Sequence, residues 1–318
     1  MVRRRSRGVP TGWEEHGSTA CVRIQIACTN RKGSFMNTVT SRDGTTIAFD
    51  RLGDGPPLVL VCGGSTDRMA NAPLAELLAE HFSVFNYDRR GRGDSGDAAP
   101  YAVEREVEDL DAVIDAGGGS AFVYGTSSGA VLALEAAASG LAITKLAMWE
   151  PPFSLDESSR PPQDQVERYD EMISAGRRGD AVEYFMTKVV GLPSEFVAYA
   201  RTQPFWQKQE ELAHTLAYDA TIMGDYSLPV ERAASVAAPT LVMAGGESFP
   251  FMRETARALA DVIPDAHRRI LEGQEHNVAP EALAPVLVEF FKAQYGARRV
   301  SRQRFRSPLL ESSKGRST

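Results

Sequence analysis

Residues 121–130 read Ala-Phe-Val-Tyr-Gly-Thr-Ser-Ser-Gly-Ala. A short apolar run enters the pentapeptide at 125–129, and a helix-forming stretch follows it. This G-x-S-x-G pattern is typical of a sharp turn between a strand and a helix, with the central serine exposed at the apex. The two flanking glycines let neighbouring backbone pack closely while the turn holds the serine in a strained conformation. The stretch therefore predicts that Ser127 is a nucleophile.

The rest of the chain alternates apolar strands with amphipathic helices. Residues 56–61 form a continuous apolar run, as a strand buried on both faces requires. Residues 103–116 place apolar side chains at helical spacing. This alternation predicts an α/β fold, a doubly wound and mostly parallel sheet with helices on both faces. The other predicted elements are a hairpin at 37–51, strands at 82–87, 121–125, 143–149, 239–244 and 268–271, and helices at 74–81, 128–139, 251–263 and 280–291.

One block interrupts the alternation. Residues 154–235 carry no clear strand and read as several amphipathic helices rich in Phe, Tyr and Met. We therefore predict a helical block inserted after the sixth strand. Some of its aromatic side chains are expected to line a pocket for an apolar or aromatic group, and most to form the core of the insert.

Length and charge divide the chain into three parts. The chain has 318 residues, of which 43% are hydrophobic and 24% charged, which suits one domain with extensions. Residues 1–35 hold seven Lys or Arg and two Glu, and residues 297–318 hold seven Lys or Arg and one Glu. Both ends are predicted to be disordered extensions of a domain at 36–296, and Met36 is an alternative start. Because the net charge is −7, the central part is acidic, which argues against a nucleic-acid-binding domain.

Composition also limits location and cofactors. No apolar run approaches the ~18 residues of a membrane span, and no hydrophobic segment follows the basic start, so neither a membrane nor a secretory signal is expected. Cys21, Cys28 and Cys62 show no disulfide or metal spacing, which predicts a cytoplasmic protein without a metal. The glycines at 117–119 precede a strand rather than a helix, so no phosphate-binding loop or other cofactor motif is predicted. A small-molecule substrate is the expected partner, and the sequence does not indicate an oligomeric state.

Four landmarks occur in an order that resembles the α/β-hydrolase family. They are a glycine turn at 62–65, a D-x-R-G-x-G-x-S-like loop at 88–95, the serine turn at 125–129, and a late histidine, His276. The resemblance covers about residues 40–292. It implies the α/β-hydrolase fold, with the 154–235 insert where the family carries its lid.

The resemblance implies a serine hydrolase with defined site residues. Ser127 would be the nucleophile and His276 the general base, in the chain order that this family uses. The backbone N–H groups of Gly64 and Ser128 would form the oxyanion hole. The chain has Cys62 where the family often has histidine, but the oxyanion role survives because the donor is a backbone group.

The acid of the triad has two candidates. The family usually places it after its seventh strand, where this chain reads Gly245-Gly246-Glu247-Ser248, so Glu247 is about one position off. Glu150 follows the sixth strand, where lipases and some dehalogenases keep the acid. A carboxylate at that position would need a partner, because burying it unpaired is costly. We favour Glu150 and keep Glu247 as the alternative.

The leading hypothesis is a hydrolase that cleaves an ester, thioester or lactone of a small apolar or aromatic molecule through an acyl-enzyme. Acyl transfer or cyclisation with the same triad is an alternative, as is a ligand-binding protein that kept the fold and lost the chemistry. The arginines at 89–92 could bind an anion, although the family implies that this loop braces the turn after its strand.

Overall fold

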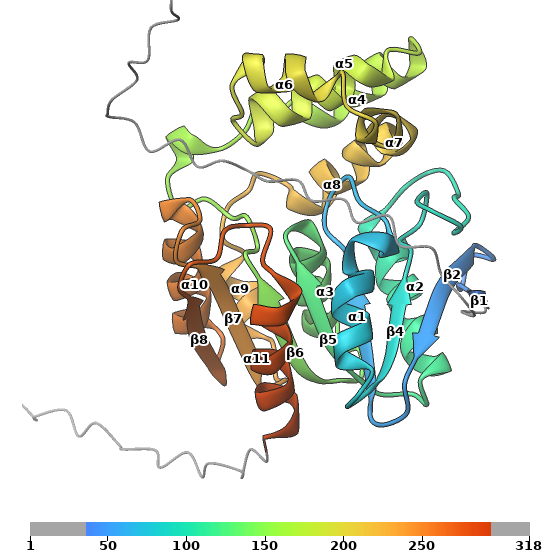
Figure 1. Cartoon of the computed structure of the whole chain (residues 1–318), viewed down its shortest axis with the longest axis vertical. Helices are drawn as coiled ribbons and strands as arrows, with labels where there is room; N and C mark the ends of the chain where they lie inside the picture. The colour runs from blue at the N-terminus through green and yellow to red at the C-terminus, as the bar shows by residue number, and fades with distance from the viewer. Residues whose placement is uncertain (1–35, 294–318) are drawn as a thin grey trace, which may run out of the picture.

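The structure, a computed structural model, describes residues 36–293, so the two predicted basic extensions lie outside the described residues. Eight strands form one sheet in the order β1-β2-β4-β3-β5-β6-β7-β8 (Figure 1). The first two neighbouring pairs in that order, β1–β2 and β2–β4, are antiparallel, and every later pair is parallel. The strands are β1 (Met36–Thr40), β2 (Thr46–Leu52), β3 (Pro57–Val61), β4 (Ser83–Tyr87), β5 (Ala121–Thr126), β6 (Ile143–Trp149), β7 (Thr240–Gly245) and β8 (Ala266–Leu271).

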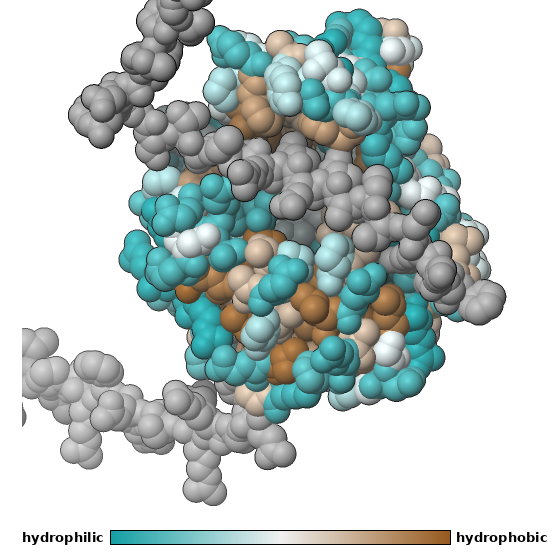
Figure 2. All heavy atoms as spheres, in the orientation of Figure 1, coloured by the Kyte–Doolittle hydropathy of each residue, from teal (hydrophilic) through white to brown (hydrophobic). Residues whose placement is uncertain are grey.

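Helices cover both faces of this sheet, which confirms the predicted doubly wound α/β fold. One core cluster joins α1 and α11 to the sheet, and a second joins α2, α3 and α10 to the opposite face. Figure 2 shows polar surface around apolar side chains that gather over α1 and α11. The helices of these layers are η1 (Arg68–Asn71), α1 (Ala72–Leu78), α2 (Val103–Ala116), α3 (Ser128–Ala138), α10 (Pro250–Val262) and α11 (Pro280–Lys292).

The segment between β6 and β7 is helical in the part of the chain that the structure describes, as predicted. Figure 1 shows α4–α7 beyond one edge of the sheet and α8 between them and the strands. These helices have their own apolar core, which includes Tyr169, Met186 and Trp206. The elements are η2 (Glu157–Ser159), α4 (Gln165–Ser174), α5 (Arg178–Tyr184), the π-helical turn η3 (Phe185–Val189), α6 (Ser194–Ala200), α7 (Phe205–Leu212), η4 (Ala213–Thr215), α8 (Leu216–Met223) and α9 (Val230–Ala234).

The strand order sets the position of the candidate site. The chain passes from β3 to β4 on one side of β3, and then to β5 on its other side. Such a reversal of strand order opens a crevice at the carboxyl ends of the strands, where ligands bind in open α/β sheets. Because β3, β5, β6 and β7 are parallel neighbours, the turns after them meet at this edge.

One predicted boundary differs for a physical reason. The strand expected at 268–271 begins at Ala266, because β8 is an edge strand that pairs with β7 alone. His267, Arg268 and Arg269 are exposed on it, so its amino-terminal half lacks the apolar run on which the prediction relied.

Candidate active site

The serine turn lies at the junction of β5 and α3. Ser127 has φ +53° and ψ −127°, a backbone conformation that residues other than glycine rarely adopt. Its N–H donates to the Trp149 carbonyl at 2.8 Å, which ties the turn to β6. A Cβ on Gly125 would lie 2.4 Å from the Gly129 carbonyl oxygen, and one on Gly129 would lie 2.3 Å from the Cys62 carbonyl oxygen. Only glycines fit at both positions, and the close packing that they permit maintains the strain at Ser127.

The glycine turn after β3 lies directly against this serine. A Cβ on Gly63 would be 3.2 Å from the Ser127 Cβ atom, and a Cβ on Gly64 would be 3.5 Å from Ser128 Oγ. Ser128 is the first residue of α3, so its N–H has no acceptor within the helix and lies at the positive end of the helix dipole. Within residues 36–293 the N–H of Gly64 donates no hydrogen bond either. Two free backbone donors therefore lie beside the serine.

Glu150 and His276 form a hydrogen-bonded pair at the same edge of the sheet. The Glu150 carboxylate is fully buried, and its Oε2 lies 2.6 Å from His276 Nδ1. Gly245 N–H donates to Oε1 at 2.7 Å, and the Ser248 hydroxyl donates to Oε2 at 2.9 Å. An ionised carboxylate only accepts hydrogen bonds, so the proton of the neutral imidazole is on Nδ1 and Nε2 keeps its lone pair. This is the tautomer that a general base requires.

Two further features position this pair. Glu150 has φ +46°, so the chain turns sharply where β6 ends and brings the carboxylate under the next loop. The buried Trp149 indole donates to the His276 carbonyl at 2.8 Å, which anchors the loop between β8 and α11. The His276 side chain retains 32% of its accessible surface, whereas Glu150 retains none. The imidazole therefore binds a buried carboxylate while part of its ring remains accessible at the carboxyl ends of the strands.

The alternative acid lies elsewhere. Glu247 is exposed, and its backbone N–H donates to the Gln274 carbonyl at 3.0 Å. No ion pair or hydrogen bond joins its carboxylate to His276 within residues 36–293. Ser248 occupies the position that the family pattern gives to aspartate, and its hydroxyl contacts Glu150 instead.

Comparisons with known proteins show which family shares this fold. Residues 58–287 match the sequence pattern of the Alpha/beta hydrolase family. The chain belongs to this family. Its structure is similar to that of an alpha/beta hydrolase from Sphaerobacter thermophilus DSM 20745, with 59% identity, a TM-score of 0.76, and coverage of 80% of this chain and 100% of that one.

Two other similarities are more limited. A hydrolase from Pseudomonas aeruginosa PA01 is 23% identical with a TM-score of 0.66, over 81% of this chain and 98% of that one, and shows the shared fold. The uncharacterized hydrolase YraK of Bacillus subtilis (strain 168) is 35% identical over 96 residues, which are 29% of this chain and 35% of that protein.

A buried charged network beneath the glycine turn was missed by the sequence analysis. Asp219, on α8, accepts hydrogen bonds through Oδ1 from Ser128 Oγ at 2.7 Å, Arg92 Nη2 at 2.8 Å and Arg89 Nη1 at 2.9 Å. Burial would raise the pKa of Asp219, but Arg92 and Arg89 outweigh it and lower that pKa below its usual range. The available signal was a single carboxylate on the mostly apolar helix Leu216–Met223.

The arginine loop is a brace rather than an open anion site. Arg89 makes two hydrogen bonds of 2.7 Å with Glu106, and Arg90 makes bonds of 2.7 and 2.8 Å with Asp109. The guanidinium groups of Arg89, Arg90 and Arg92 have no exposed surface. Their charges are paired with carboxylates inside the protein.

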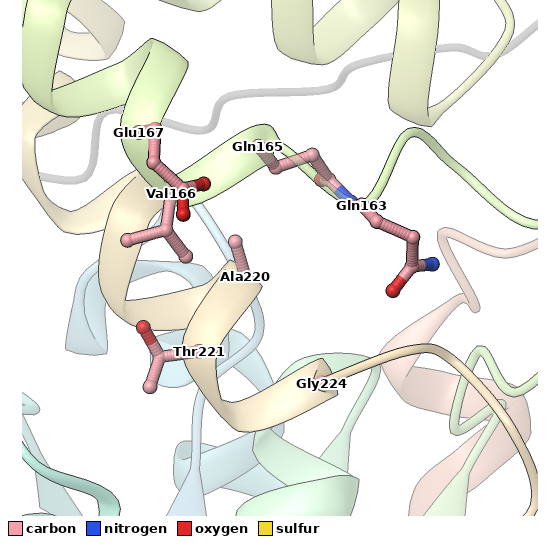
Figure 3. Close-up of a pocket in the computed structure, with 7 residues that line it drawn as sticks. All are labelled: Gln163, Gln165, Val166, Glu167, Ala220, Thr221 and Gly224. Atoms are coloured by element: carbon pink, nitrogen blue, oxygen red, sulfur yellow. The ribbon is translucent and has the colours of Figure 1, made fainter.

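Three observations concern the described residues outside the candidate site. A pocket of about 380 Å³ lies between α4 and α8, and Figure 3 shows Gln163, Glu167 and Thr221 among its lining side chains, none of which is a predicted site residue. Within residues 36–293, no three His, Cys, Asp or Glu side chains are grouped as a metal site would need. None of the helices in the same range combines the length and apolar character needed to cross a bilayer.

Proposed function

We propose that this protein is a serine hydrolase that cleaves a carboxylic ester, thioester or lactone through an acyl-enzyme. The observation that carries the proposal is the pair formed by the buried Glu150 and the partly exposed His276, 2.6 Å apart. Ser127 is held at a strained apex, and its N–H is bonded to the carbonyl of Trp149, the residue before Glu150. A serine hydroxyl is a weak nucleophile until a base removes its proton, and an oriented histidine is such a base.

The first half of the reaction follows from the positions of these groups. Ser127 Oγ attacks the carbonyl carbon while its proton passes to His276 Nε2. Glu150 holds the imidazole through Nδ1 and stabilises the positive charge that forms on it. Negative charge develops on the carbonyl oxygen, to which the N–H groups of Gly64 and Ser128 donate hydrogen bonds. His276 then gives its proton to the leaving alcohol, thiol or internal oxygen, and an acyl-Ser127 ester remains.

The second half uses the same groups in reverse. Water enters at the leaving-group position and loses a proton to His276 Nε2 as its oxygen attacks the acyl carbon. The oxyanion of the tetrahedral intermediate again accepts hydrogen bonds from the two backbone donors. Its collapse releases a carboxylic acid and returns the proton to Ser127 Oγ, so atoms and charges balance over the cycle.

The charges near the site favour an uncharged substrate. The arginines at positions 89, 90 and 92 are fully buried and paired, so they do not offer a guanidinium to a substrate carboxylate or phosphate. The insert is rich in apolar and aromatic side chains, most of which form its own core, and we propose that some of the others line the substrate pocket. A small apolar or aromatic acyl or alcohol group therefore fits the proposal best.

A single labelling experiment tests the proposed chemistry. Wild-type protein and Ser127→Ala would be treated with a fluorophosphonate and examined by intact mass, and screened in parallel on nitrophenyl esters of increasing chain length, a thioester and a lactone. One adduct on the wild type that disappears in Ser127→Ala, together with turnover of at least one substrate, supports the proposal. An adduct that persists in the variant, or a folded wild type without adduct or turnover, would refute it.

A further inference from the structure

Arg92 connects the glycine turn to the helical insert. Its Nη1 donates to the Gly63 carbonyl at 2.6 Å and to the Thr66 carbonyl at 3.2 Å. Its Nη2 donates to Asp219 Oδ1 at 2.8 Å. The guanidinium has no exposed surface, so these bonds form away from water, where a charge-assisted hydrogen bond is strong.

The Gly63 carbonyl matters because of the peptide unit to which it belongs. The Gly63 carbonyl and the Gly64 N–H are parts of one planar group, and this peptide bond is trans. In a trans peptide the two groups point in opposite directions. When Arg92 fixes the carbonyl on one side, it also fixes the direction of the Gly64 N–H on the other. The positive charge polarises the peptide as well, which strengthens that N–H as a donor.

Asp219 links both proposed oxyanion donors. One carboxylate oxygen binds Arg92, which holds the Gly63–Gly64 peptide, and the same oxygen binds the hydroxyl of Ser128, whose N–H is the second donor. Its other oxygen packs against Gly64, where an added Cβ would lie only 3.1 Å away. Asp219 therefore contacts both sides of the site, although it belongs to the insert.

We propose that Arg92 and Asp219 are positioning residues that set the geometry of the oxyanion hole, Arg92 through the Gly63–Gly64 peptide and Asp219 through Arg92 and Ser128. The inference rests on the proposed function. It means that the insert helps to build the catalytic site through α8. Neither residue touches the substrate; each acts through a backbone group that does.

The same loop supplies a matched control. Arg90 is as deeply buried as Arg92, and its guanidinium is likewise paired inside the protein, with Asp109 and Asp43. Its remaining bond goes to the Arg105 carbonyl, and it has no hydrogen bond to the 62–66 turn within the described residues. Arg90→Lys should therefore disturb folding about as much as Arg92→Lys does, without moving the oxyanion donors.

The test measures how strongly the oxyanion hole favours an ester with a carbonyl oxygen over one with sulfur at that position. Arg92→Lys, Asp219→Asn and Arg90→Lys would be compared with wild type on a matched pair of esters, one with a carbonyl oxygen and one with sulfur in its place. Sulfur is larger and accepts hydrogen bonds poorly, so a well-formed hole favours the oxygen ester. Arg92→Lys keeps the charge but has one nitrogen, which cannot hold the Gly63 carbonyl and Asp219 in the fork geometry of arginine.

We expect Arg92→Lys to lower kcat for the oxygen ester by about 10- to 100-fold with little change in KM, because a misplaced donor affects the transition state most. The oxygen-to-sulfur rate ratio should fall in parallel. Asp219→Asn keeps the shape but loses the charge that holds Arg92, so both effects should be smaller. Arg90→Lys should lower the melting temperature and leave the ratio unchanged.

Different outcomes would refute either the inference or the proposed function. A folded Arg92→Lys with a wild-type ratio refutes the inference, and a fall of the ratio in Arg90→Lys of equal size also refutes it. If Arg92→Lys does not fold, Asp219→Asn decides, and an unchanged ratio there refutes the inference. A wild type that neither reacts with a fluorophosphonate nor turns over an ester refutes the proposed function, and the inference with it.

Discussion

Replacement of Glu150 by glutamine changes one atom at the most constrained point of the candidate site. The carboxylate accepts from Gly245 N–H through Oε1, and from the His276 ring and the Ser248 hydroxyl through Oε2. An amide oxygen at the first position keeps the bond to Gly245. The NH₂ group then points at His276 Nδ1, where it must donate. The proton of the imidazole moves to Nε2, and the histidine can no longer act as a base.

The opposite amide orientation does not avoid this result. It would place the NH₂ group against the buried Gly245 N–H, two donors facing each other, at a cost of about 1–3 kcal/mol. The wrong tautomer should therefore prevail. In a serine protease triad the corresponding change lowers kcat by about 10⁴-fold, which corresponds to about 5 kcal/mol in the barrier. We expect a loss of that order here.

The assay is the second-order rate of fluorophosphonate labelling, followed by intact mass, together with ester hydrolysis. Glu247→Gln is the control, because that side chain is exposed and has no bond to His276 within the described residues, so its rates should match the wild type. The tautomer argument is refuted if folded Glu150→Gln keeps its rate within about tenfold of wild type. It is also refuted if Glu247→Gln is the slower variant.

Three further changes have defined outcomes. Ser127→Gly should be more stable than Ser127→Ala by about 1 kcal/mol in chemical denaturation, because glycine relieves the strain of φ +53°; equal stability would contradict this. Gly129→Ala should lose at least about 3 kcal/mol in the same assay, since its Cβ would lie 2.3 Å from the Cys62 carbonyl oxygen. Burial would raise the pKa of Asp43, but hydrogen bonds from neighbouring donors lower it to about 2. Because the unfolded pKa is about 3.9, its stabilisation should be complete above about pH 4 and lost toward pH 2, and Asp43→Asn should remove that part of the pH dependence.

The fold was predictable because its signals are local. Strands buried on both faces read as apolar runs, and the helices between them repeat at 3.6 residues, so the element order and the parallel sheet follow from the pattern. Ser127 lies in a turn whose glycines are required by contacts of 2.3 to 2.4 Å, and this constraint is visible as a motif. The predicted strand at 268–271 is shorter than β8. Because β8 is an edge strand with solvent-exposed side chains over most of its length, it lacks the apolar run that marks a buried strand.

The network around Asp219 could not be predicted in the same way. Its bonds to Arg89 and Arg92 join residues 130 and 127 positions apart. No spacing in the sequence relates a loop after β4 to a helix of the insert. Only the fold brings them together, and a lone carboxylate on an apolar helix indicates that some partner is needed without showing which one.

The two candidate acids were ambiguous for a geometric reason, and the same geometry suggests a decisive experiment. Because β6 and β7 are neighbouring parallel strands, a side chain after either can reach His276. Ser248 Oγ lies 2.9 Å from Glu150 Oε2, and that oxygen lies 2.6 Å from His276 Nδ1, so an aspartate at 248 would place a carboxylate near the same point. Glu150→Gly removes the native acid at a residue whose φ of +46° suits glycine. Adding Ser248→Asp should then restore labelling at least about tenfold over Glu150→Gly alone, whereas Ser248→Asn, equal in size but uncharged, should restore none. Equal rates for the two double variants would refute the argument that a carboxylate after β7 can take the place of the one after β6.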